Sequence, residues 1–200
     1  MITLGIIGVV AAMTMPALIT NTKKSEVSAR LKKFVSVINQ ALIMAESEHG
    51  MREDWIIGEQ NNQESSYNFL NTYIKPYIKS FEIEKENKYG KSGATLRFVD
   101  GSQVFIKIGV CYDIFYDVNG EKLPNQEGRD IFVFILCKSA PYQLCKLNTN
   151  QVTGFWCQAD QDRPTSKEKL YALCKKAPEN CTMLLEDNQW EIPKDYPIRL

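Results

Sequence analysis

The chain has 200 residues, enough for one ordinary domain and one additional element. Its 24 basic and 24 acidic residues give a formal net charge of zero, and no long basic stripe occurs, so nothing electrostatic indicates nucleic-acid binding. Glycine and proline occur at ordinary levels, which does not favour a disordered chain.

The first predicted element is an uncharged hydrophobic run, ITLGIIGVVAAMTMPALI, from Ile2 to Ile19. At ~1.5 Å per residue, a helix of this length spans about 27 Å, close to the hydrocarbon thickness of a bilayer. Small residues such as Gly5 and Gly8 suit close helix contacts in lipid, and Pro16 would bend the helix axis. We therefore expect residues 1–22 to lie in a membrane or in the core of a filament.

The helical pattern continues beyond this run. Apolar residues recur at spacings of three and four from Val27 to Ala45. No proline or glycine follows within the pattern until Gly50, which suits the left-handed conformation that ends many helices. The sequence predicts one helix from Ile2 to His49, and two helices joined at Asn21-Thr22 are the alternative.

The head is expected to span 23–200 and to include the amphipathic part of the long helix, 23–49. A second helix is predicted from Ser65 to Phe81, although Pro76 weakens it. The charged stretch from Glu82 to Ser92 is interpreted as a loop.

Short strands follow this loop. The segments TLRFV and QVFIKI flank Asp100-Gly101, a strong hairpin signal, and YDIFYDV precedes Asn119-Gly120 and the strand at Ile131–Leu136. They predict an α+β fold, in which the long N-terminal helix packs on a small antiparallel sheet of three or four strands. A capping box at Thr165–Glu168 predicts a short helix through Lys175, followed by an irregular tail.

The cysteines all lie in the second half of the chain, and none has the C-x-x-C spacing of zinc or thioredoxin-like sites. An even number without metal spacing predicts three disulfides that brace the C-terminal region in an oxidising compartment, whereas buried reduced thiols are the alternative. Six cysteines allow 15 pairings. Cys174 with Cys181 is attractive because it closes a short loop after a helix. The six are Cys111, Cys137, Cys145, Cys157, Cys174 and Cys181.

One loop has the composition of a metal site. Asp117, Asn119 and Glu121 alternate along it, with Asp130 behind them, and these side chains offer the oxygen ligands that calcium prefers. The pattern is not an EF-hand, because its twelfth position is Gly128. The alternative is a polar turn in which the carboxylates accept hydrogen bonds from nearby amides.

The sequence offers little for catalysis. His49 is the only histidine and lies at the predicted end of the long helix, where a structural role is expected. No nucleophile elbow, zinc-protease motif or P-loop occurs. We therefore expect a protein that is not an enzyme and holds no cofactor other than calcium.

The hydrophobic run resembles the N-terminal segment of type IV pilins and type II secretion pseudopilins. These proteins carry a short basic leader and Gly-Phe-Thr-Leu-x-Glu before such a run, and Pro16 matches their helix-bending proline. The resemblance implies that the leader, the N-methylated Phe and the Glu precede Met1 in the natural protein. Three segments of the head, Thr72–Lys79, Tyr116–Phe134 and Asn188–Ile198, also resemble pilin-like proteins.

This resemblance implies a pilin-like fold and a structural subunit of a type IV pilus or a type II secretion filament. It places the protein in a bacterial inner membrane with an extracytoplasmic head, or in an extracellular pilus. The implied partners are other pilin subunits, bound through the N-terminal helix, a prepilin peptidase and the inner-membrane assembly platform. Some pseudopilins bind calcium in the head. Two alternatives remain open: a minor tip subunit or adhesin that binds a ligand, and an anchored extracytoplasmic enzyme.

Overall fold

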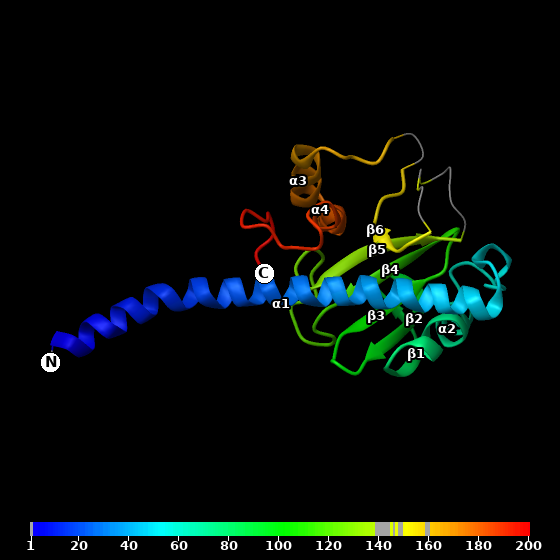
Figure 1. Cartoon of the computed structure of the whole chain (residues 1–200), viewed down its shortest axis with the longest axis horizontal. Helices are drawn as coiled ribbons and strands as arrows, with labels where there is room; N and C mark the ends of the chain where they lie inside the picture. Colours follow the sequence, from blue (N-terminus) through cyan, green and yellow to red (C-terminus); the bar gives the residue numbers. More distant parts are fainter. Residues whose placement is uncertain (1, 139–144, 146, 148–149, 159–160) are drawn as a thin grey trace.

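The protein is a long helix with a head built on the C-terminal half of that helix (Figure 1). The computed structural model describes residues 2–138, 145, 147, 150–158 and 161–200, and along the first helix it describes side chains from residue 20 on. Because the same helix belongs to both parts, its C-terminal half determines where the head sits.

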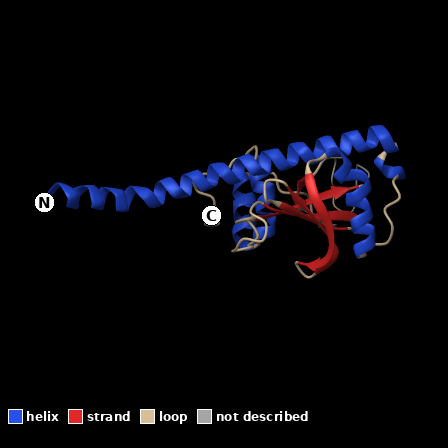
Figure 2. Cartoon of the chain, turned by 90° about the horizontal axis from the view of Figure 1, so that it is seen from below, coloured by secondary structure: helices blue, strands red, loops and turns tan. Residues whose placement is uncertain are grey.

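Helix α1 is continuous from Ile2 to His49, as the periodicity predicts, and it ends before Gly50, whose φ is +81°. Figures 1 and 2 show its N-terminal part extending away from the head with a curved axis. The side chain of Pro16 lies outside the described residues, so its role in bending the helix stays a prediction. The α1 residues that face the sheet are fully buried: Val27, Leu31, Phe34, Ile38, Leu42 and Ala45.

A six-stranded antiparallel sheet packs on α1, with its strands in chain order. The predicted meander corresponds to the four inner strands, and an additional strand lies at each edge. The strands are β1 (Ser80–Lys88), β2 (Lys91–Phe98), β3 (Gln103–Lys107), β4 (Cys111–Asp117), β5 (Ile131–Cys137) and β6 (Thr153–Gly154).

The predicted loop from Glu82 to Ser92 is wrong. This stretch forms most of strand β1 and the start of β2, which are joined by a tight turn with Tyr89 and Gly90 at positive φ. The charges that suggested a loop are used in cross-strand pairs, such as that of Glu84 with Arg97. Strand β1 lies at the edge of the sheet, where charged side chains stay in water.

The predicted helix from Ser65 to Phe81 is wrong in its last residues, because the helical turns end at Tyr77 and β1 begins at Ser80. Helix α2 (Gln63–Phe69) starts at Asn62, whose side chain accepts hydrogen bonds from the amides of Glu64 and Ser65. A π-helical turn, η2 (Leu70–Ile74), and a 3₁₀ turn, η3 (Lys75–Tyr77), follow. Pro76 has no N–H to donate, and the chain becomes extended at Ile78 and enters β1.

Short helices occupy the C-terminal region. Helix α3 (Lys167–Lys176) confirms the predicted short helix, but the predicted capping box at Thr165–Glu168 is wrong, because the N-cap residue is Ser166 and its side chain makes no capping hydrogen bond. A 3₁₀ turn, η4 (Pro178–Asn180), leads into helix α4 (Cys181–Asp187), which the sequence analysis missed. Another 3₁₀ turn, η1 (Arg52–Asp54), follows α1.

The six cysteines form three disulfides, which confirms the expected bridges and the pairing of Cys174 with Cys181. Cys111 and Cys137 join strands β4 and β5 at directly opposite positions. The third bridge, between Cys145 and Cys157, lies beside the first, with the sulfurs of Cys145 and Cys111 3.9 Å apart. The C-terminal half of the head is therefore covalently braced.

Candidate functional site

The structure brings two of the predicted metal ligands together inside the head. Asp117 ends strand β4 and Asp130 precedes β5, and both are almost fully buried. Burial raises the pKa of Asp117, and the neighbouring Asp130 charge acts in the same direction, whereas hydrogen bonds oppose it. Two carboxylates that are buried close together need hydrogen-bond donors or a bound cation to stabilise their charge.

Protein donors occupy both carboxylates. Asp117 accepts hydrogen bonds from the backbone amides of Asn119 and Gly120, at 3.1 and 3.0 Å, and from the side-chain amide of Gln103, at 3.1 Å. Asp130 accepts from the backbone amides of Asn125 and Gln126, at 3.0 and 2.6 Å. The loop between the two strands is thus held by its own aspartates.

The other two predicted ligands, Asn119 and Glu121, lie in different places. Asn119 joins the group, but through its side-chain nitrogen, which donates to Asp130 Oδ2 at 3.2 Å. Its buried Oδ1 has no hydrogen-bond partner among the described residues. Glu121 lies apart, on the exposed side of the loop, where it pairs with Lys88 and Arg97.

This geometry fits a polar turn better than a calcium site. The buried carboxylate oxygens that a cation needs already accept hydrogen bonds from the protein, and the Glu121 carboxylate is occupied by cations of the chain itself. The one feature in favour of a metal is the unpartnered Asn119 Oδ1. Calcium binding at this loop is therefore a prediction that a calcium titration would test.

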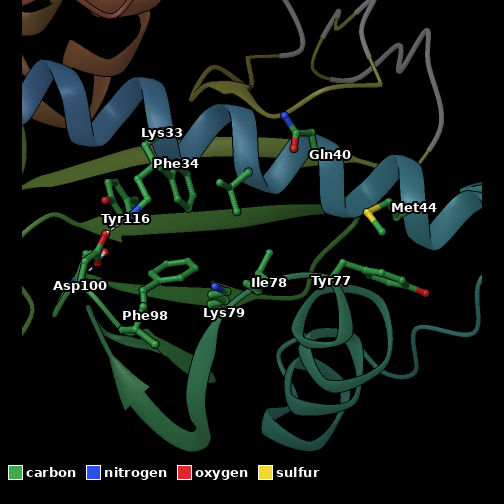
Figure 3. A pocket seen from close by; sticks show the side chains of 13 residues that line it. Lys33, Phe34, Gln40, Met44, Tyr77, Ile78, Lys79, Phe98, Asp100 and Tyr116 are labelled. Atoms are coloured by element: carbon green, nitrogen blue, oxygen red, sulfur yellow. Dashed lines mark hydrogen bonds and ion pairs between the residues drawn. The ribbon is translucent and has the colours of Figure 1, made fainter.

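A second feature, which sequence reasoning missed, is a cleft of about 290 Å³ between α1 and the sheet (Figure 3). Hydrophobic residues dominate its lining, and Figure 3 shows Phe34, Phe98 and Tyr116 grouped at one end and Met44 and Tyr77 at the other. The lining residues from α1 are Lys33, Phe34, Val37, Gln40 and Met44; those from the rest of the head are Tyr77, Ile78, Lys79, Phe98, Val99, Asp100, Ser102 and Tyr116.

Aromatic packing fixes the floor of the cleft. The rings of Phe34 and Tyr116 stack with their centroids 4.0 Å apart, and Phe98 meets Phe34 edge to face at 6.3 Å. Burial raises the pKa of Tyr116 to about 12, so its hydroxyl stays neutral at physiological pH. The floor of the cleft is therefore apolar and closely packed, which suits contact with an apolar side chain.

Polar contacts close both ends of the cleft. At one end, Lys33 Nζ lies 2.7 Å from Asp100 Oδ2. At the other end, the Tyr77 hydroxyl donates to Glu48 at 2.6 Å, and this bond raises the Tyr77 pKa to about 12. Lys79 stands on the rim without an ion-pair partner among the residues described. The cleft therefore offers an apolar interior beside a cation.

His49 and the three tryptophans pack against other side chains of the head. His49 packs edge to face on Tyr73, with ring centroids 5.3 Å apart. Trp55 stacks on the same Tyr73 at 4.0 Å, and Trp190 packs against Phe134 at 5.6 Å. Trp156 is buried in the core as well.

Among the helical side chains that the structure describes, which start at residue 20 of α1, no stretch is long and apolar enough to cross a membrane. Nearly all of the predicted membrane or filament segment, 1–22, lies outside those side chains.

Comparisons with known proteins give one match. The model of a family of unknown function, DUF6613, matches residues 17–200. No curated protein and no solved structure matches the chain. The matched region covers the whole head, including the loop of Asp117 and the cleft beside Phe34. The chain belongs to this family of unknown function, DUF6613.

Proposed function

We propose that this protein is a structural subunit of a bacterial type IV pilus or type II secretion filament, and not an enzyme. In this role, residues 1–22 pack in the inner membrane and then against other subunits, and the head faces outward. A prepilin peptidase and an inner-membrane assembly platform are the further partners that the pilin resemblance implies.

The observation that supports this role most is the division of α1. The C-terminal tail contacts α1 at Lys24, whose Nζ donates to the carbonyls of Pro193 and Lys194 at 3.0 and 2.8 Å. One turn later, Ser28 accepts from the amide of Ile192 at 2.9 Å. The part of the helix before these contacts extends away from the head (Figure 2), and in sequence it is the uncharged run Ile2–Ile19.

An uncharged helical segment that the head does not cover requires another apolar environment, because burial of apolar surface is the main favourable term in association. Lipid supplies that environment before assembly, and the same segments of other copies supply it afterwards. The small residues in the run favour close packing in both cases.

The disulfides support the outward position of the head. All six cysteines are paired, and such bridges persist in oxidising compartments rather than in the cytosol. The head therefore suits the periplasm or the cell exterior.

Self-assembly of the full chain tests this proposal. We expect the purified protein to form filaments, visible by electron microscopy, when detergent is removed. Replacing Val9 by Lys puts a charge into the apolar run and should abolish filaments. The matched control, Ser47→Lys, adds the same charge at an exposed position of α1 and should leave assembly unchanged. Monodisperse monomers of the unaltered chain without detergent would contradict the proposal.

A further inference from the structure

We propose that the cleft beside α1 is the contact site for a second copy of this chain and receives Ile56 of a neighbouring subunit. This inference rests on the proposed function, because it assumes that copies pack side by side with their long helices parallel. The new element is the identity of the two surfaces through which neighbouring heads make contact.

Ile56 is a rigid apolar projection. Its side chain is 89% exposed, although the residue before it, Trp55, is buried. The Trp55 ring stacks on Tyr73 and its Nε1 donates to the Gly50 carbonyl at 2.9 Å, so the backbone at Ile56 is firmly placed. Binding such a preorganised side chain costs little conformational entropy.

The same segment is anchored from its other side by a buried arginine. Arg52 is 4% exposed, and its guanidinium contacts Glu46 of α1 at 3.0 Å and the carbonyl of Asn150 at 2.5 Å. Burial lowers the pKa of Arg52, whereas Glu46 opposes this shift. Turn η1 is thereby fixed to the end of α1, and Ile56 with it.

The charges around the two surfaces are complementary. Exposed acidic residues flank Ile56 in sequence, namely Glu53, Asp54 and Glu59. On the cleft side, the exposed Lys79 lies on the rim and has no ion-pair partner within the part of the chain that the structure describes. Opposite charges at the edge of an apolar contact set its register and favour the correct encounter.

The cleft has room and apolar surface for an isoleucine side chain. Its volume is about 290 Å³, and Val37, Ile78 and Phe98 line it. Met44 and Val99 at its edge are 53% and 55% exposed. Covering these side chains removes apolar surface from water on both partners.

The spacing along α1 suits a staggered parallel neighbour. The cleft is bordered by α1 from Lys33 to Met44, which places it between about 8 and about 24 Å before the end of the helix at His49, at ~1.5 Å per residue. Ile56 lies just past that end. A neighbour displaced along the rod by this distance brings its Ile56 level with the cleft. Because the two surfaces differ and each neighbour is displaced along the rod, the contact repeats without closing into a ring and generates a filament.

Photo-crosslinking in the assembled full chain tests this contact. The probe p-benzoylphenylalanine replaces Ile56, and the control places it at Leu123, which is 83% exposed on another loop. Mixing isotope-labelled and unlabelled copies identifies crosslinks between chains by mass spectrometry. We expect the Ile56 probe to link to peptides that contain residues 33–44 or 77–100 of another copy.

Reversing the charge at the rim of the cleft provides a second test. Lys79→Glu reverses the rim charge and should lower the Ile56 crosslink yield about threefold, given the ~0.2–1 kcal/mol of an exposed ion pair and the added repulsion. Lys175→Glu makes the same change on α3 and should leave the yield unchanged. Assembled chains whose Ile56 crosslinks fall elsewhere would overturn this contact and leave the proposed function standing. Chains that do not assemble at all would overturn both.

Discussion

Lys33 of α1 and Asp100 in the turn between β2 and β3 form an ion pair across the end of the cleft, with Nζ and Oδ2 2.7 Å apart. The Asp100 carboxylate also accepts hydrogen bonds from the amide and hydroxyl of Ser102, at 3.1 and 2.6 Å. The long helix is thus joined to the sheet by a charged contact beside the apolar one.

This pair makes stability depend on pH. Burial raises the pKa of Asp100, but Lys33 and the bonds from Ser102 outweigh it and lower the pKa from 3.8 to about 2. A lowered pKa means that the contribution is present above about pH 4 and is lost as the pH falls to about 2.

Asp100→Asn should therefore destabilise the protein by about 1 kcal/mol at pH 7, since both side chains are partly exposed and screened by solvent. The difference should vanish near pH 2. Chemical denaturation at the two pH values measures it, with Asp187→Asn, an exposed change on α4, as the control. An equal loss at both pH values would contradict the electrostatic explanation.

Phe34 makes the apolar contact between α1 and the sheet next to this ion pair. Its side chain is 3% exposed and packs against Tyr116, Phe98 and Phe134. Phe34→Ala should lower the free energy of unfolding by about 3–5 kcal/mol. Ile43→Ala, at an exposed position of the same helix, should change it by less than about 0.5 kcal/mol. Similar losses for both variants would show that α1 does not pack on the sheet through Phe34.

The loop of Asp117 and Asp130 should fold without a metal, because amides of the protein already satisfy both carboxylates. We expect calcium in the millimolar range to leave the melting temperature of the full chain unchanged. Asp117→Asn removes a carboxylate from the loop and serves as the comparison. A rise in melting temperature for the unaltered protein, absent in this variant, would establish a calcium site there.

The bridge between Cys174 and Cys181 closes a short loop, with a sequence separation of 7. Replacing both cysteines by serine should lower the free energy of unfolding by about 2–3 kcal/mol, which is the chain-entropy expectation for a loop of this length. Urea denaturation under non-reducing conditions measures this loss. Adding a reductant should then affect the double variant less than the unaltered protein; an equal effect would argue that this bridge contributes nothing.

The long helix was predictable because its signal is local. The spacing of Val27, Leu31 and Phe34 fixes the buried face of α1, and Gly50 marks its end. The inner strands were predictable for a similar reason, since their apolar runs are separated by clear turn residues such as Gly101 and Gly120.

Elements whose residues depend on distant partners were not predictable. Strand β1 is a highly charged edge strand, and its extended form depends on pairing with β2, as in the pair of Glu84 and Arg97. Helix α4 is short, and Cys181 to Leu185 are all buried, so it lacks the polar face that reveals an amphipathic helix.

The two candidate sites also differ in how far the sequence predicts them. The composition of the Asp117 loop groups Asp117, Asn119, Glu121 and Asp130, but only the structure shows that Glu121 lies apart from the other three. The cleft joins Lys33, Lys79 and Asp100, which lie on three different elements, and no sequence pattern links them.

We propose that the N-terminal part of α1 resides in lipid or against other copies, with the head outside the cytoplasm. The most direct measurement is cell fractionation of the full chain produced from its native locus, combined with protease treatment of spheroplasts and alkylation of thiols. We expect a membrane-bound protein that resists carbonate extraction, whose head is cleaved by protease added from outside and whose cysteines do not react with the alkylating reagent. A freely dissolved intracellular monomer with six reactive cysteines would contradict it.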